Sequence, residues 1–239
     1  MKVLEGQGNY LQEKARINKK RAILFFIIGL GFLLASYTIS TLGLLIYAFF
    51  VSLSISSIFL KNYENYSKGL EAETAVAEYL QILDDRYYLI NDIKLPNSYG
   101  NIDHIVLGPN GIFVIETKNF GGCIRCDGDS WYQHKPEWKT KNEIELKSPS
   151  KQVKGNSVRL KNFIESGKIF PSATSLWVEG IVVFTNIDME LHLNSPTVPT
   201  MKIDELSHYI LNKQSRTKFS AQELESIGKL ILTASGRIE

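Results

Sequence analysis

The sequence NIDHIVLGPNGIFVIETKN, residues 101–119, decides the fold of this chain. Its centre, GPNG at residues 108–111, is a strong turn signal between two apolar runs, which predicts an antiparallel hairpin of residues 101–107 and 112–118. Charged side chains are rarely buried unless they are paired, so charges inside these apolar runs need a physical explanation. Three such side chains are present: Asp103, Glu116 and Lys118.

The sequence leaves two registers open for this hairpin. Its turn is centred on either residues 109–110 or residues 110–111. The first register places Asp103 opposite Glu116, and the second places it opposite Lys118. In both registers the three charges share one face, because alternate residues of a strand point to the same side. Two carboxylates that face each other across a sheet repel and raise each other's pKa unless a positive group lies between them.

A divalent metal ion would supply that positive group. Oxygen ligands suit Mg²⁺ or Mn²⁺, and Mg²⁺ usually takes one or two protein carboxylates and keeps waters or phosphate oxygens for its other positions. Lys118 would then orient or deprotonate an attacking water, or hold negative charge on a phosphate. The alternative is a structural salt bridge of Lys118 with Glu116 or Asp103, because a D…ExK pattern is short and recurs by chance.

Helical and strand patterns surround the hairpin. Residues 68–83 have apolar side chains at helical spacing, and Pro149 begins a second helix that is predicted to bury Val153, Val158, Leu160, Phe163 and Ile164. The apolar run at residues 176–186 is typical of a strand covered on both faces. Two more helices are expected near the C-terminus, and Ser220 with Glu223 gives the second of them a capping box.

These stretches resemble the nuclease-related domain family, which is named for its similarity to nucleases of the restriction-endonuclease-like PD-(D/E)XK fold. The resemblance covers residues 68–186 and includes KGLEAE, the quoted hairpin, GDSWYQ, SPSKQ and VEGIVVFTN. It implies an α/β fold with a restriction-endonuclease-like mixed sheet flanked by helices. It also implies hydrolysis of phosphodiester bonds in DNA or RNA that depends on Mg²⁺ or Mn²⁺.

The resemblance assigns site residues as well. It implies a catalytic set of Asp103, Glu116, Lys118 and Gln152. It implies metal ligation by Glu73, Asp103 and Glu116. The family often has glycine before its helical acid, where this chain has Ala72, so Glu71 remains a rival of Glu73.

An apolar segment precedes the domain. Residues 22–60 contain no Asp, Glu, Lys, Arg or His, and one straight helix of that length would reach about 58 Å, against about 30 Å for the hydrocarbon core of a bilayer. Two transmembrane helices that reverse near residues 35–43 fit better, although the serines at 54, 56 and 57 make the second less apolar. Basic residues among residues 1–21 then place both termini in the cytoplasm, with the nuclease-related domain at residues 61–239.

Charge gives a second test of nucleic-acid binding. From residue 61 onward the chain has 21 basic and 23 acidic residues, which excludes a protein that coats DNA through charge alone. Residues 135–168 are locally basic, and Trp131, Tyr132 and Trp138 lie beside or within them. Two interpretations stay open: a surface that holds a phosphate backbone and stacks a base, or a solvated lysine-rich loop. The competing hypothesis is a membrane-tethered module without catalysis that binds nucleic acid or protein through the stretch from Trp131 to Arg159, including Lys151 and Lys154.

Other sequence patterns give weaker evidence for a functional site. Cys123 and Cys126 form a single C-x-x-C, and a structural zinc site normally needs four ligands, so the sequence does not favour zinc there. His104 is expected to point to the sheet face opposite Asp103 and to be buried by packing. A third interpretation makes the helical hairpin itself functional through oligomerisation, with Gly29 and Gly31 as small surfaces for helix packing. The two spans do not both show a clear small-xxx-small pattern.

Overall fold

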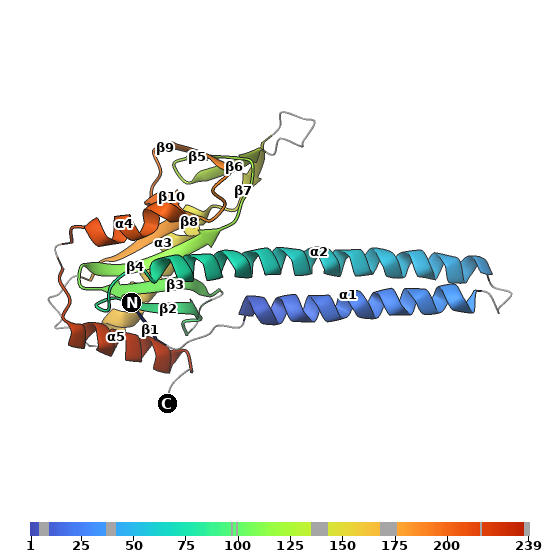
Figure 1. The fold of residues 1–239 in the computed structure, drawn as a ribbon, viewed down its shortest axis with the longest axis horizontal. Helices are drawn as coiled ribbons and strands as arrows, with labels where there is room; N and C mark the ends of the chain where they lie inside the picture. The colour runs from blue at the N-terminus through green and yellow to red at the C-terminus, as the bar shows by residue number, and fades with distance from the viewer. Residues whose placement is uncertain are drawn as a thin grey trace. The chain divides into compact units, whose positions relative to one another are not determined.

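The computed structural model describes residues 1–4, 10–36, 42–96, 98, 100–134, 143–167, 176–215 and 217–236. The chain divides into two compact units, an α/β unit of Met1–Gly8 with Ala72–Glu239 and a helical unit of Asn9–Glu71 (Figure 1). The composition places the start of the soluble domain at residue 61. The compact α/β unit instead starts at residue 72 and also includes the N-terminus.

A six-stranded mixed sheet forms the centre of the α/β unit. Its strands, in spatial order, are β1 (Lys2–Val3), β2 (Tyr88–Ile93), β3 (Ile102–Gly108), β4 (Gly111–Lys118), β8 (Val178–Phe184) and β10 (Thr200–Lys202). β2, β3 and β4 pair antiparallel, whereas β8 is parallel to β4 and to β10. The N-terminal strand β1 pairs parallel with β2, so the first residues of the chain extend this sheet.

Helices cover both faces of the sheet. Buried residues of α3 (Pro149–Ser166) and α5 (Ala221–Ala234) belong to the core on one face, and those of α4 (Ile203–Asn212) and the end of α2 belong to the core on the other. The predicted capping box of Ser220 with Glu223 is present, and α3 begins at Pro149 as predicted, with Ser148 Oγ accepting a hydrogen bond from the Lys151 N–H. Val158 is 56% exposed, so the prediction that it faces inward is wrong. The α/β class with a mixed sheet and flanking helices is confirmed.

A second, four-stranded sheet lies in the same unit. Its strands, in spatial order, are β7 (Ile144–Leu146), β6 (Ser130–His134), β5 (Cys123–Asp127) and β9 (Glu190–Asn194) (Figure 1). Trp131 of β6 is fully buried, and its ring lies 5.7 Å from that of Phe184 at the end of β8. The second sheet therefore shares the hydrophobic core on the α3 and α5 side of the first.

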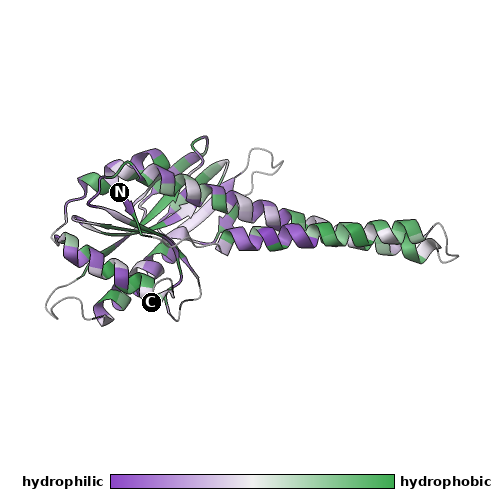
Figure 2. Cartoon of the chain, turned by 60° about the horizontal axis from the view of Figure 1, so that its bottom comes forward, coloured by the Kyte–Doolittle hydropathy of each residue, from purple (hydrophilic) through white to green (hydrophobic). Residues whose placement is uncertain are grey.

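The helical unit is formed by α1 (Tyr10–Ala35) and most of α2 (Leu42–Leu80). These helices contact each other at Gly29, where an added Cβ would lie 3.3 Å from Cβ of Ser52. The rings of Phe25 and Phe59 stack with their centroids 5.6 Å apart. Figure 2 shows that the apolar parts of both helices lie side by side, toward the end of α1 and the start of α2.

Serines in α2 satisfy their hydroxyl groups within this helix pair. Ser56 donates to the Ala22 carbonyl of α1 at 2.9 Å, and Ser52 donates to the Phe25 carbonyl. Ser54 and Ser57 donate to carbonyls of their own helix at 2.9 and 2.8 Å. An unsatisfied polar group is costly in an apolar environment, so these bonds explain how a mostly apolar segment tolerates its serines.

One helix within the described residues, Gly43–Leu80, is long and apolar enough to cross a membrane by length and composition. The helix α1 is not apolar enough over the same length, because any stretch of 18 residues within it includes Lys19, Lys20 and Arg21. The expected pair of spans is therefore supported for the second span only. The structure also joins that span to the helix predicted at residues 68–83, since α2 continues without a break.

Candidate functional site

The register of β3 and β4 places the charged residues of the hairpin. Gly108 pairs with Gly111 and Leu107 with Ile112, which is the register with its turn centred on residues 109–110. The same register places Asp103 opposite Glu116, so the first of the two predicted alternatives is the observed one. The face that carries them is the one covered by α3, because Ile105 and Val114 on this face belong to the core with α3.

Glu116 is the most deeply buried acid of the hairpin, with a side chain that is 1% exposed. Its Oε1 accepts from Lys118 Nζ at 2.5 Å, whereas its Oε2 is buried without a hydrogen-bond partner among the described residues. The backbone N–H of Thr117 donates to Oδ2 of the half-buried Asp103 at 2.8 Å. The salt bridge of the alternative interpretation is present, but it leaves one oxygen of Glu116 unsatisfied.

Glu73, near the end of α2, belongs to the same cluster of charges. Burial and the charges of Asp92 and Glu116 raise its pKa to about 8, although Lys118 opposes the shift. Burial and the charges of Glu116 and Glu73 also raise the pKa of Asp103 well above its ordinary value. The rival residue Glu71 is exposed. Glu73 is therefore the helical acid that interacts with the hairpin carboxylates.

Asp92 of β2 is a fourth acid of the cluster, which the sequence analysis did not single out. It is buried, has a positive φ of 50°, and accepts a hydrogen bond from Asn101 Nδ2 at 2.5 Å. Its neighbours in β2 pair with His104 and Ile102, which places Asp92 beside Asp103. Positive φ is uncommon for residues other than glycine and is found at functional sites. The available sequence signal was a polar Asn–Asp pair inside an apolar strand.

The donor set of this cluster fits a hard divalent cation. All candidate ligands are carboxylate oxygens, which hard cations prefer. Burial raises the pKa of Glu116, although the charges of Lys118 and Lys147 lower it. The Oε2 of Glu116 has no hydrogen-bond partner among the described residues. Among the described residues, these acids do not bring three ligand atoms within 4.8 Å of one another. The arrangement therefore fits an ion held by one or two carboxylates and by waters, as is usual for Mg²⁺, and not a closed protein cage.

A cavity of about 380 Å³ lies beside the acids. Asn101, the hydrogen-bond donor to Asp92, is part of its wall, and so is Lys147, whose charge lowers the pKa of Glu116. Gln152, predicted near the site, also lines the cavity. The remaining lining residues are Gly100, Ser148, Lys151, Asn156 and Arg159. Three of the side chains around this cavity are cationic, so positive charge borders the carboxylate cluster.

The aromatic part of the predicted nucleic-acid surface is not supported. Trp131 is fully buried and donates from Nε1 to Ser150 Oγ at 2.9 Å, so the prediction that it stacks a base is wrong. Tyr132 lies under the guanidinium of Arg125, at 4.5 Å from ring centroid to Cζ. Trp138 falls outside the described residues. Lys154 is also held elsewhere, because Asp129 accepts from its Nζ at 2.8 and 2.6 Å.

His104 lies on the opposite face of β3, as the alternation predicts. Its side chain is buried, and Nδ1 lies 2.8 Å from Oδ1 of Asn91 on the neighbouring strand. Burial lowers the pKa of His104 to about 3. A neutral histidine on this face is a packed core residue and takes no part in the acid cluster.

The raised pKa of Glu73 predicts a pH-dependent cost to stability in metal-free buffer. Between the ordinary value of 4.5 and about 8 the folded chain binds more protons than the unfolded chain, so the free energy of unfolding falls as pH rises through this range. The substitution Glu73→Gln removes this effect. It should raise the free energy of unfolding by about 2 kcal/mol at pH 8 and change it little at pH 5, as measured by urea unfolding with EDTA.

The matched control is Glu78→Gln, at an exposed position of the same helix. This control should have no effect at either pH. An equal change at pH 5 and pH 8 for Glu73→Gln would contradict the electrostatic explanation, since a packing effect does not titrate.

Comparisons with known proteins identify a family over the part of the chain that contains this site. Residues 68–185 match the family described as the nuclease-related domain, and this range contains every predicted site residue. An uncharacterized protein of Bacillus anthracis is 36% identical over 78 residues, which cover 31% of this chain and 36% of that protein. No solved structure matches the chain significantly. Over residues 68–185 the chain therefore belongs to the nuclease-related domain family.

Proposed function

We propose that this domain hydrolyses phosphodiester bonds in DNA or RNA with the help of Mg²⁺ or Mn²⁺. The observation that carries the proposal is Glu116, a buried carboxylate with one oxygen that has no partner among the described residues, in a cluster with three further acids and Lys118. Structural salt bridges do not require so many like charges in one place. The family match and the expected similarity of that family to PD-(D/E)XK nucleases support the same chemistry.

Each residue of the cluster has a role in this proposal. Asp103 and Glu116 would hold the cation, with Glu73 as a third ligand directly or through water. When bound, the ion would act as a Lewis acid and lower the pKa of a bound water. The side chain of Lys118 is 20% exposed and its ammonium group lies against Glu116, so it would hold charge that develops on the phosphate or orient the water.

The cavity beside the cluster would hold the backbone of the nucleic acid. Lys147, Lys151 and Arg159 line it together with the amide side chains of Gln152 and Asn156. Cationic and amide groups are the usual partners of phosphate oxygens. Because the domain as a whole has a slight excess of acidic residues, local charge at this cavity would matter more than net charge.

Cleavage tests the catalytic proposal. Asp103→Asn and Lys118→Met, made separately in the full-length chain, should each lower Mg²⁺-dependent cleavage of single- and double-stranded DNA and RNA by at least about 100-fold. Asp188→Asn, at an exposed position that does not belong to the acid cluster, is the control and should cleave normally. Unchanged cleavage by both site variants, with folding verified by circular dichroism, would dispose of the mechanism.

Binding in EDTA tests the phosphate cavity separately from cleavage. Lys151→Glu and Arg159→Glu should each weaken binding of an oligonucleotide and reduce the slope of log affinity against log salt by about one, because each removes a phosphate contact. Lys161→Glu makes the same charge change on α3 at a residue that pairs with Glu165, and it should weaken binding less. An equal loss in all three variants would show that net charge and not the cavity decides binding. Cavity-dependent binding without any cleavage by the unsubstituted protein would favour the non-catalytic module.

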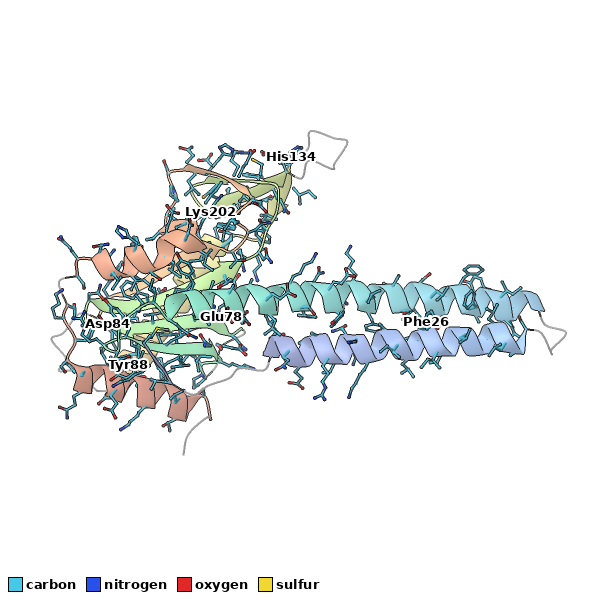
Figure 3. All side chains as sticks on the ribbon, in the orientation of Figure 1. Phe26, Glu78, Asp84, Tyr88, His134 and Lys202 are labelled. Atoms are coloured by element: carbon cyan, nitrogen blue, oxygen red, sulfur yellow. The ribbon has the colours of Figure 1, made fainter. Side chains whose placement is uncertain are left out.

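We further propose that α1 and α2 anchor the protein in a membrane as a two-span hairpin. Large apolar side chains cover the outside of both helices, including Phe26, which is 55% exposed and is labelled in Figure 3, and Tyr47, which is 68% exposed. The connectivity supports an even number of crossings, because β1 and β2 belong to one sheet and the two helices lie between them in the chain. Lys19, Lys20 and Arg21 would extend to the headgroups at the end of the shorter apolar part of α1.

Labelling with a membrane-impermeant maleimide tests this topology. In sealed vesicles of known orientation, Ser40→Cys, in the segment between the helices, should react from the side opposite to the domain. With the reagent on that same side, Ile238→Cys, near the C-terminus, should react only after the vesicles are permeabilised. Reaction of both positions from the same side, or release of the protein from the vesicles by alkaline carbonate, would contradict the hairpin anchor.

A further inference from the structure

The second sheet brings Cys123 together with two potential metal ligands, Glu190 and His192, that lie far from it in the sequence. Cys123 begins β5 and Glu190 begins β9, and the parallel register of these strands places the two residues side by side. His192 follows two residues after Glu190 and therefore points to the same face. The Cys123 Sγ, a Glu190 carboxylate oxygen and a His192 ring nitrogen all lie within 4.8 Å of one another.

The C-x-x-C spacing does not create this cluster. Cys126 lies three residues after Cys123 on the same strand, so it points to the opposite face, where it is fully buried. Its Sγ donates to the Gly128 carbonyl at 3.3 Å. The partners of Cys123 are instead supplied by the neighbouring strands. On the other side of β5, the residue paired with Cys123 is His134 of β6, which is labelled in Figure 3.

Thiolate, imidazole and carboxylate ligands are the combination that binds Zn²⁺ and similar transition-metal ions. Adjacent ligand atoms in a tetrahedral zinc site are separated by roughly 3.5 Å, given metal–ligand bonds of about 2.0–2.3 Å. The Nε2 of His192 already lies 3.7 Å from Oε2 of Glu190. The Glu190 and His192 side chains are 76% and 63% exposed, so both are able to change rotamer and close the remaining gap to Cys123.

We propose that Cys123, Glu190 and His192 bind a zinc-type divalent cation, with water or His134 in the fourth position. This ion would connect β5 to β9, an edge strand whose side chains are largely exposed. Binding would release the proton of the Cys123 thiol, so the complex weakens as pH falls. The site is separate in chemistry from the acid cluster, because sulfur selects Zn²⁺ over Mg²⁺ whereas carboxylates alone do not.

Cobalt titration of the reduced full-length chain tests the proposal. Co²⁺ should produce a thiolate-to-metal charge-transfer band in the near ultraviolet together with visible bands of a tetrahedral centre, and Zn²⁺ should displace it. Cys123→Ser should abolish the charge-transfer band. Glu190→Gln and His192→Ala should each weaken binding by at least about tenfold, the lower limit seen for residues that only support a metal ligand.

Two controls separate this site from other metal binding. His208→Ala removes an exposed histidine of α4, and Asp103→Asn alters the acid cluster; both variants should keep the charge-transfer band. Unchanged affinity and spectrum in Cys123→Ser would overturn the proposal, and so would Co²⁺ binding that never shows a thiolate band in the unsubstituted chain. Zn²⁺ at a hundredfold excess over its Kd should also raise the Tm of the unsubstituted chain by about 5–10 °C, a shift that Cys123→Ser should lose.

Discussion

The register of the β3–β4 hairpin is the constraint on which the acid cluster depends. A slip by one residue would move Asp103 and Glu116 to opposite faces, because the side-chain period of a strand is two. The turn is held from both sides: Asn110 donates to the Ile210 carbonyl at 2.6 Å, and Tyr87 donates to Asn110 Oδ1 at 3.0 Å. Tyr87 also occupies the space that a side chain at Gly108 would need, since an added Cβ there would lie 2.3 Å from its ring. The position of the turn and the position of the acids are therefore set by the same packing.

Repulsion among the acids of the cluster destabilises the folded state, and other interactions of the domain offset this cost. The pKa values of Glu73, Asp103 and Glu116 are all raised, and Lys118, which donates to Glu116, neutralises a single charge. A well-packed apolar substitute would be less costly, so such a group of acids is more typical of a functional site than of a structural one. The buried positive-φ residue Asp92 adds backbone strain at the same place.

Local patterns in the sequence predicted the local features of this structure. The hairpin, the capped helices and the shared face of Asp103, Glu116 and Lys118 follow from alternation, turn residues and caps within short stretches of the chain. Features that depend on tertiary neighbours were missed or wrong. Trp131 is buried in the core and not available at the surface, and Lys154 forms a salt bridge with Asp129. The pairing of Cys123 with Glu190 joins strands 67 positions apart, which no local pattern reveals.

Composition likewise located the apolar segment but not the limits of the structural units. The change to polar residues after residue 60 does not end a helix, because no glycine or proline interrupts α2 between residues 44 and 68 and the backbone hydrogen bonds continue through it. At the other end, residues 1–21 read as one basic segment, yet their first residues pair with β2 and the Met1 amino group donates to the Leu83 carbonyl at 2.7 Å. The chain thus leaves the α/β unit through one helix and returns to it through another. If either helix crosses a membrane, the other must cross it too, because a single crossing would separate β1 from the sheet that contains it.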